Sequence, residues 1–377
     1  MAQYSRAIFV PRCFGIRRSP RRRPAAPLHA FDSAREGFQG LEDLAAAYWY
    51  SEVLFAALEL ALFDGIESGH QQVDDLARKV GCLSEELGRL LRALGRIGLI
   101  RETGGRWVNS PAARRFLVSG SGDYMGDFLL YRRYIQPRWS ALADRISRPD
   151  RPRRPRLTAE DDYRIRNEHY VQAMDRLIRR KSLEIAQILA REAWCGPVLD
   201  VGGGAGSLGR AILATRRDAV GVLLDLSEVI EAGRRIHPDS RQWERILPVA
   251  GDFRHHPFRA GRFGLVVMSN FLHVYARNSA RELLGTAVSL LRPDGMLLIH
   301  DYFPDRTGSR PHKGALYDLN MMLNTCEGVC HESREIAEWL AALGIPRVIV
   351  RDLATDTSLI LAGRLPGRPR EVPAKSE

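Results

Sequence analysis

The chain has 377 residues, of which 45% are hydrophobic and 27% charged, a composition typical of a globular protein rather than of a disordered or fibrous one. The length predicts two domains, and no run approaches the roughly 18 apolar residues that a membrane-spanning helix needs. Five cysteines argue against a disulfide-stapled secreted scaffold and favour a reducing compartment.

The formal net charge of +11 is concentrated in three segments. Residues 1–40 carry a net charge of +6, residues 148–156 carry +4 and residues 363–377 carry +2, so the rest of the chain is close to neutral. A high isoelectric point often accompanies nucleic-acid binding. That indication is weak here, because the basic charge lies in the two ends and in a connector.

Residues 1–40 combine prolines, glycines and an arginine run without periodicity, which predicts a disordered basic tail. Residues 364–377 are expected to form a second flexible tail. An Arg-rich, acid-poor beginning is also compatible with organelle targeting. A cytoplasmic location is the main expectation, and targeting is the alternative.

Residues 41–120 show the pattern of a winged-helix-like domain. We predict one long apolar helix over 41–66 and a short helix over 73–80 that ends at Gly81. A third helix begins at Ser84, whose hydroxyl could cap it, and leucines spaced three and four residues apart form an apolar stripe.

Residues 99–108 complete this domain as a two-stranded wing, since two short β-rich runs flank the pair Gly104-Gly105. Residues 121–192 follow as connecting helices over 123–146 and 159–189.

The third helix also supports a competing interpretation as a DNA-recognition helix, because Arg89, Arg92 and Arg96 lie on roughly one face. Glu85 precedes Arg89 by four residues, however, and that spacing is typical of a solvated face with its own ion pairs. We therefore predict no nucleic-acid partner and no membrane partner.

Residues 193–363 alternate short β-rich runs with helical ones. The predicted strands are 197–201, 220–225, 246–250, 263–269, 296–300, 347–352 and 358–361, and the predicted helices are 206–216, 227–237, 279–291 and 332–343. This alternation predicts an α/β fold with a doubly wound, mostly parallel sheet covered on both faces. The short gap between the last two strands predicts an antiparallel edge hairpin.

Three motifs follow consecutive predicted strands, at the edge where open α/β sheets bind ligands. The first is Asp200 with the glycine-rich segment 202–206, whose glycines allow close approach of a ligand. Asp225 ends the next strand, where a carboxylate can accept ribose hydroxyls. Residues 251–253, Gly-Asp-Phe, place a carboxylate for an adenine amino group and an aromatic ring beside the base.

The glycine segment also satisfies G-x-G-x-x-G through Gly204, Gly206 and Gly209, which is the dinucleotide fingerprint. An NAD-dependent oxidoreductase is therefore an alternative. Asp200 argues against it, because a carboxylate at this place would repel a pyrophosphate and suit a cationic ligand such as S-adenosylmethionine.

The segment 198–361 resembles the S-adenosylmethionine-dependent O-methyltransferases of the plant caffeic-acid and acetylserotonin type, which have bacterial members. The resemblance is carried by LDVGGGAG, LLDLSEVIEAGRR, VAGDF, NFLHVYARNSARELL and LRPDGMLLIHDYF. It implies a Rossmann-like class I methyltransferase domain, preceded by an N-terminal domain used for homodimerisation. With the motifs above, it places at the cofactor Asp200, Gly202, Gly204, Asp225, Leu226, Gly251, Asp252, Phe253 and Ser269.

The resemblance also implies that His273 is the general base and that Asp301 orients it. A histidine suits this role near neutral pH, and His273 follows a strand at the cofactor edge. Two positions depart from the family pattern. Val274-Tyr275 stands where Asp-Trp is usual, and Cys330 stands where the plant enzymes have a second acidic partner, so Glu327 or Glu332 could substitute.

The expected acceptor is an aromatic or polyketide-like small molecule, because apolar and aromatic side chains suit a flat ligand. The resemblance implies that the connecting helices over 121–192 contribute to the acceptor pocket. Its candidate residues are Met174, Tyr131, Met321, Met322 and Asn324, with Tyr134 and His169 as weaker ones. The spacing of Cys326, Cys330 and His331 matches no metal motif, so no metal is expected. A relative that catalyses hydroxylation or decarboxylation is the alternative function.

Overall fold

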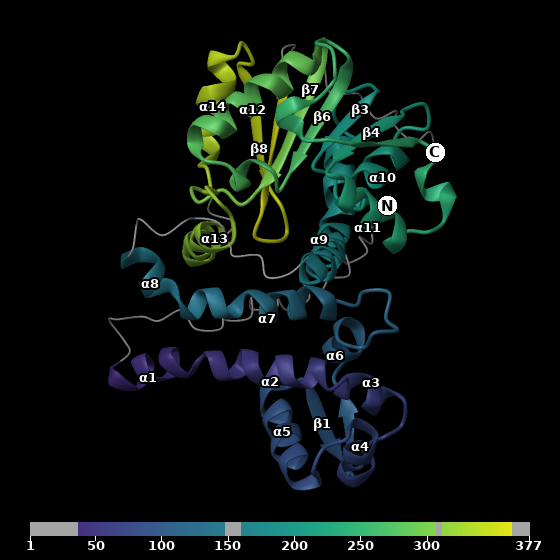
Figure 1. The fold of residues 1–377 in the computed structure, drawn as a ribbon, viewed down its shortest axis with the longest axis vertical. Helices are drawn as coiled ribbons and strands as arrows, with labels where there is room; N and C mark the ends of the chain where they lie inside the picture. The colour runs from purple at the N-terminus through teal and green to yellow at the C-terminus, as the bar shows by residue number, and fades with distance from the viewer. Residues whose placement is uncertain (1–36, 148–159, 307–310, 364–377) are drawn as a thin grey trace, which may run out of the picture. The chain divides into compact units, whose positions relative to one another are not determined.

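The computed structural model describes residues 37–147, 160–306 and 311–363 (Figure 1). The basic tail expected over 1–40 lies outside these residues except for its last four, where the first helix begins. The tail expected over 364–377 lies outside them as well. In the part of the chain that is described, no helix is both long and apolar enough to cross a membrane.

The chain divides into two compact units after Leu54. The first unit contains helix α1, Phe38–Ala46, and the beginning of α2, Tyr48–Glu59. Large apolar side chains are exposed along this segment: Phe38, Leu41, Leu44, Tyr48, Trp49 and Tyr50.

The second unit begins with the remainder of α2 and a helical domain with a wing. Its elements are α3 (Leu62–Glu67), α4 (Val73–Val80), α5 (Ser84–Ile97), β1 (Ile100–Thr103), β2 (Arg106–Asn109) and α6 (Pro111–Phe116). The short helix, its stop at Gly81 with φ +73°, and the antiparallel wing are confirmed. The predicted ion pair of Arg89 with Glu85 also forms.

Two helix predictions in this region are wrong. The single helix expected over 41–66 is three helices, broken at Ala47 and again before Leu62, where Ala61 takes a left-handed φ of +50°. Apolar periodicity does not reveal a left-handed alanine, because that conformation is set by packing rather than by residue type. Ser84 does not cap α5 either, since Leu83 occupies the N-cap position and Ser84 is already helical.

Three helices connect this domain to the sheet. They are α7 (Gly126–Ser140), α8 (Leu142–Ser147) and α9 (Glu160–Leu189), so the one helix predicted over 123–146 is two helices separated at Ala141. Helix α7 packs against α9 and against α13 (Pro311–Asn324), a helix that the sequence analysis did not predict.

A seven-stranded sheet forms the centre of the remaining chain. The strands are β3 (Val198–Val201), β4 (Gly221–Asp225), β5 (Ile246–Ala250), β6 (Phe263–Ser269), β7 (Leu291–Asp301), β8 (Arg347–Asp352) and β9 (Ser358–Gly363). Their order is β5-β4-β3-β6-β7-β9-β8, with β9 antiparallel to both neighbours. The predicted sheet and its edge hairpin are confirmed, and the order reverses at β3, which creates the switch point.

Helices cover both faces of this sheet (Figure 1). Helix α9 lies on one face with α10 (Ser207–Ala214) and α11 (Ser227–Ile236), and their apolar side chains share a core with alternate residues of the strands. Helices α12 (Arg277–Leu290) and α14 (Ser333–Ala342) pack on the other face. The central strands are buried on both sides, which explains their continuous apolar runs.

Candidate active site

The glycine segment forms a tight loop between β3 and α10. Gly202, Gly204 and Gly206 have φ of +64°, +60° and +79°, a region that side chains with a Cβ avoid. A Cβ on Gly202 would also come within 2.7 Å of the Phe271 ring. The loop therefore needs glycine for its conformation and, at Gly202, for space.

The carboxylate of Asp225 holds this loop from the end of the neighbouring strand. It accepts hydrogen bonds from the backbone N–H of Gly204 and of Leu226, each at 2.8 Å. Burial raises the pKa of Asp225 to about 6, although both hydrogen bonds act in the opposite direction. Each carboxylate oxygen keeps a lone pair that could accept a ribose hydroxyl.

Asp200 lies beneath the glycine loop, and its contact with the cofactor stays a prediction. Its side chain is 3% exposed, and Cβ atoms built on Gly203 and Gly209 would lie 2.8 and 2.9 Å from its Oδ2. Burial, and then the negative charge of Asp225, raises the pKa of Asp200 to about 7. The carboxyl group therefore supports the loop from the sheet side.

The predicted adenine site after β5 is made of the short helix η2, Phe253–His255. The Asp252 carboxylate accepts from the backbone and the guanidinium of Arg254, and this pairing lowers the pKa of Asp252. Gly251 donates its N–H to the carbonyl of Asp225 at 2.9 Å. Phe253 is 3% exposed and packs edge-on against Phe271, so it belongs to the core, and its contact with an adenine stays a prediction.

Ser269 ends β6 beside this region, and its hydroxyl is 2.8 Å from Nδ1 of His300. The other ring nitrogen of His300 is 2.9 Å from the hydroxyl of Thr357. Burial lowers the pKa of His300 to about 3, so the ring is neutral and serves as a hydrogen-bond link. The hydroxyl of Ser269 therefore already has a hydrogen-bond partner within the protein, the ring of His300.

The structure brings His273 and Asp301 together. His273 lies in the short helix η3, Leu272–Val274, which follows β6, and its Nδ1 contacts Oδ1 of Asp301 at the end of β7. Asp301 also accepts the backbone N–H of Tyr302 at 2.8 Å. Burial would raise the pKa of Asp301, but the charge and the hydrogen bond of His273 outweigh it and keep that pKa low.

The protonation pattern of this pair follows from the chemistry of its members. Because Asp301 is ionised, it can only accept hydrogen bonds, so Nδ1 of His273 must carry the proton. In the neutral form of the imidazole, the opposite nitrogen, Nε2, then has a lone pair that can accept a proton. Tyr317 stands edge-on to the imidazole with 5.5 Å between ring centroids, which fixes the orientation of the ring further.

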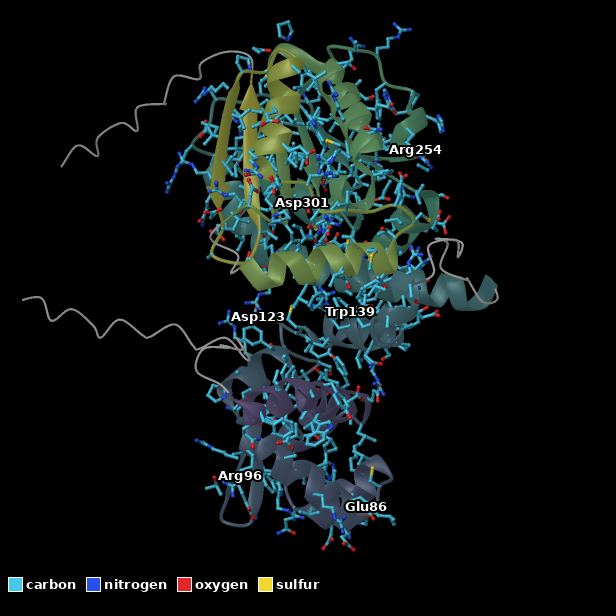
Figure 2. All side chains as sticks on the ribbon, turned by 90° about the vertical axis from the view of Figure 1, so that its left-hand side faces the viewer. Glu86, Arg96, Asp123, Trp139, Arg254 and Asp301 are labelled. Carbon is cyan, nitrogen blue, oxygen red and sulfur yellow. The ribbon has the colours of Figure 1, made fainter. Side chains whose placement is uncertain are left out.

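A cavity of about 650 Å³ lies beside His273, within the size range of small-molecule sites. The predicted residues Tyr131, Tyr134, Met174, Met321 and Asn324 line it. Met322 and His169 are not among its lining residues. Figure 2 shows Asp301 within the α/β domain and Trp139, whose indole N–H donates to Asn320 on α13.

Glu327 and Glu332, the two candidates for a second acidic partner of His273, have different surroundings. Glu327 lines the cavity, whereas Glu332 is paired with Arg334 away from it. Cys330 is buried, and burial raises the pKa of its thiol well above the usual range. Among the described residues, no group of three or more His, Cys, Asp or Glu side chains could hold a metal ion.

Sequence reasoning missed Asn270, which directly follows β6 and stands three residues before His273 in the sequence. It lines the cavity, takes a left-handed φ of +51°, and its buried Oδ1 has no hydrogen-bond partner within the described segments. An asparagine directly after a strand was the available signal, because this residue tolerates left-handed backbone. Arg132, Arg138 and Tyr317 also line the cavity and were not predicted.

Comparisons with known proteins agree with this geometry. Residues 42–119 match the O-methyltransferase dimerisation domain, and residues 159–346 match the O-methyltransferase domain. A 3-hydroxy-5-methyl-1-naphthoate 3-O-methyltransferase from Streptomyces sahachiroi is 28% identical over 86% of this chain and 94% of its own. The acetylserotonin O-methyltransferase of Rattus norvegicus is 30% identical over 87% of this chain and 78% of its own.

A solved structure of an O-methyltransferase from neocarzinostatin biosynthesis, in complex with S-adenosylmethionine and 2-hydroxy-5-methyl naphthoic acid, has the same fold. It superposes with a TM-score of 0.68 at 25% sequence identity, over 88% of this chain and all of the other.

Proposed function

The chain belongs to the S-adenosylmethionine-dependent O-methyltransferases, and on that premise we propose that it methylates a hydroxyl group of a small aromatic molecule bound beside His273. Relatives named above act on or bind naphthoates and acetylserotonin, which are aromatic. Tyrosine and methionine side chains in the cavity suit a flat acceptor of this kind.

The residues at the strand ends fit the cofactor. S-adenosylmethionine supplies a methyl group already activated by its sulfonium. The left-handed glycines leave room for a ligand against the backbone, and Asp225 keeps free lone pairs beside them. We assign to Asp225 the ribose hydroxyls, and to the unpartnered Oδ1 of Asn270 a hydrogen bond with a donor on the cofactor or the acceptor.

His273 is the proposed general base. Its Nε2 takes the proton of the acceptor hydroxyl as the oxygen–methyl bond forms and the sulfur–methyl bond breaks. Asp301 holds Nδ1 and stabilises the imidazolium that results. The buried pair beside a cavity is the single observation that carries the proposal, because a hydroxyl must lose a proton during methyl transfer.

The same pair favours oxygen over nitrogen as the methylated atom. A hydroxyl needs a base to remove its proton, whereas a neutral amine attacks with its own lone pair and has less need of a base. The question arises because relatives named as N-methyltransferases also match this chain, at 24% and 26% identity. We also propose that the protein is a homodimer, which the dimerisation domain and the exposed apolar side chains of α1 and α2 support.

The experiment is transfer of labelled methyl from S-adenosylmethionine to hydroxyaryl acceptors. The variant H273Q should lose about a hundredfold to ten-thousandfold in turnover. Its affinity for S-adenosylhomocysteine, measured by calorimetry, should stay within about twofold of wild type, as expected for a residue off the cofactor. The control H70Q changes a histidine that pairs with Asp75 on α4 and should leave both quantities unchanged.

If H273Q lost cofactor affinity and turnover together, His273 would be structural rather than the base.

A further inference from the structure

The acceptor cavity carries more positive charge than its own side chains neutralise. Arg132, Arg138 and Arg254 line it, and the acid among its lining residues is Glu327. Arg254 is neutralised by Asp252 through paired hydrogen bonds. The other two arginines therefore determine the sign of the charge that a ligand meets.

Neither of these two arginines has a carboxylate partner in the described part of the chain. Arg138 donates to a neutral amide, Oδ1 of Asn324, at 2.8 Å, which ties α7 to α13. Arg132 lies over the ring of Phe128, with 5.0 Å between its Cζ and the ring centroid. A guanidinium stacked on an aromatic ring keeps its N–H donors at the edge available for another group.

Arg132 also lies near the residues that orient His273. Burial raises the pKa of Tyr302 and of Tyr317, and the positive charge of Arg132 acts in the opposite direction on both. These two tyrosines are stacked with 3.7 Å between centroids, and Tyr317 contacts the imidazole of His273. The guanidinium therefore lies close enough to influence the same pair of tyrosines that the imidazole of His273 contacts through Tyr317.

A partly buried guanidinium without a carboxylate is a binding group for a planar anion. Its fork of N–H donors matches a carboxylate, and the shielded cavity strengthens the interaction relative to water. Because the walls are tyrosine and methionine side chains, the anion must belong to a flat and mostly apolar molecule.

We propose that the acceptor is a hydroxyaryl carboxylic acid whose carboxylate binds Arg132 while its hydroxyl faces His273. This inference rests on the proposed function and specifies its substrate class. Methyl transfer leaves the carboxylate unchanged: the hydroxyl proton passes to Nε2 of His273, and the methyl passes from sulfur to the hydroxyl oxygen. Arg138, fixed by Asn324, adds to the positive potential at the same wall.

The test compares hydroxybenzoic and hydroxynaphthoic acids with their methyl esters, pair by pair. Each probe is titrated calorimetrically into the protein loaded with S-adenosylhomocysteine. We expect acids to bind wild type at least about tenfold more tightly than their esters, as a charge-assisted hydrogen bond implies. R132Q should weaken the acids by about tenfold to a hundredfold and the esters by less than about twofold, and R132K should restore part of the loss.

The matched control is R133Q on the same helix. Arg133 lies near Glu59, at 3.5 Å, and over the ring of Phe55, and it is not among the cavity's lining residues. R133Q should leave the discrimination between acid and ester unchanged. If R133Q lost the preference for acid over ester, any positive charge on α7 would be enough to produce that preference. The assignment to Arg132 would then be overturned.

The inference is overturned if no acid binds better than its ester, or if R132Q weakens acid and ester equally. In that case methylation of the esters would leave the proposed function standing. Failure to bind S-adenosylhomocysteine, or to methylate any hydroxyl probe, would instead remove the proposed function and this inference with it.

Discussion

The affinity of the protein for its cofactor should depend on pH through Asp225. This carboxyl group has a pKa raised to about 6 by burial in the free protein. Ribose hydroxyls donate hydrogen bonds, so they favour the ionised carboxylate and lower that pKa in the complex. Binding near pH 6 must therefore release protons into solution.

The size of this effect follows from the pKa of Asp225. A group with a pKa of about 6 is half protonated at pH 6, and about one molecule in eleven is ionised at pH 5. If the ionised form binds the ribose, the apparent affinity at pH 5 is about tenfold below that at pH 8. At pH 6 about half a proton is released for each ligand bound.

The assay is calorimetric titration with S-adenosylhomocysteine at pH 5, 6 and 8, in pairs of buffers with different ionisation enthalpies. D225N should bind more weakly and lose the proton release. D200N should retain the proton release at pH 6, because Asp200, whose pKa is about 7, is mostly protonated where Asp225 titrates and adds little charge beside it. Equal affinity at pH 5 and pH 8 in wild type, with no proton release at pH 6, would refute the reasoning.

Two further predictions concern stability. The pKa of Asp200 is raised to about 7 in the folded protein, so its contribution to stability is fully present below about pH 4 and is lost as the pH rises through 7. In urea denaturation, the free energy of unfolding of D200N should therefore exceed that of wild type by about 4 kcal/mol at pH 8 and equal it at pH 4. The same excess at both pH values would contradict this. G202A should lower the free energy of unfolding by about 2 kcal/mol or more, because the alanine would have a left-handed φ and a close contact with Phe271. The control G98A has φ +84° but open space around it, so it should lose only the backbone cost of about 1–2 kcal/mol. Equal losses in the two variants would argue against the contact with Phe271.

Much of the fold could be predicted because the parallel strands are buried on both faces. The runs 246–250, 263–269 and 347–352 coincide with β5, β6 and β8. Predictions failed where tertiary packing decides the backbone. The left-handed Ala61 breaks a continuous apolar pattern that by itself predicts one helix.

The candidate site shows the same division between place and direction. His273 and Asp301 could be predicted to meet, since they follow the adjacent parallel strands β6 and β7 at one edge of the sheet. Asp200 lies near that same edge, in β3, but its side chain points under the glycine loop. The sequence does not show whether such a side chain points under the loop or toward a ligand. Met322 is a second example, because Met321 lines the cavity and Met322 is not among the lining residues. Which residues of α13 face the cavity depends on how this helix packs against α7.

The most direct test of the central claim compares two acceptors on one scaffold in single-turnover reactions. One has an ordinary phenol, and the other has a nitro substituent that ionises the hydroxyl at the assay pH. If His273 removes the acceptor proton, H273Q should slow methylation of the first by about a hundredfold to ten-thousandfold and of the second by less than about tenfold. An equal loss for both acceptors would contradict the assignment of His273 as the base.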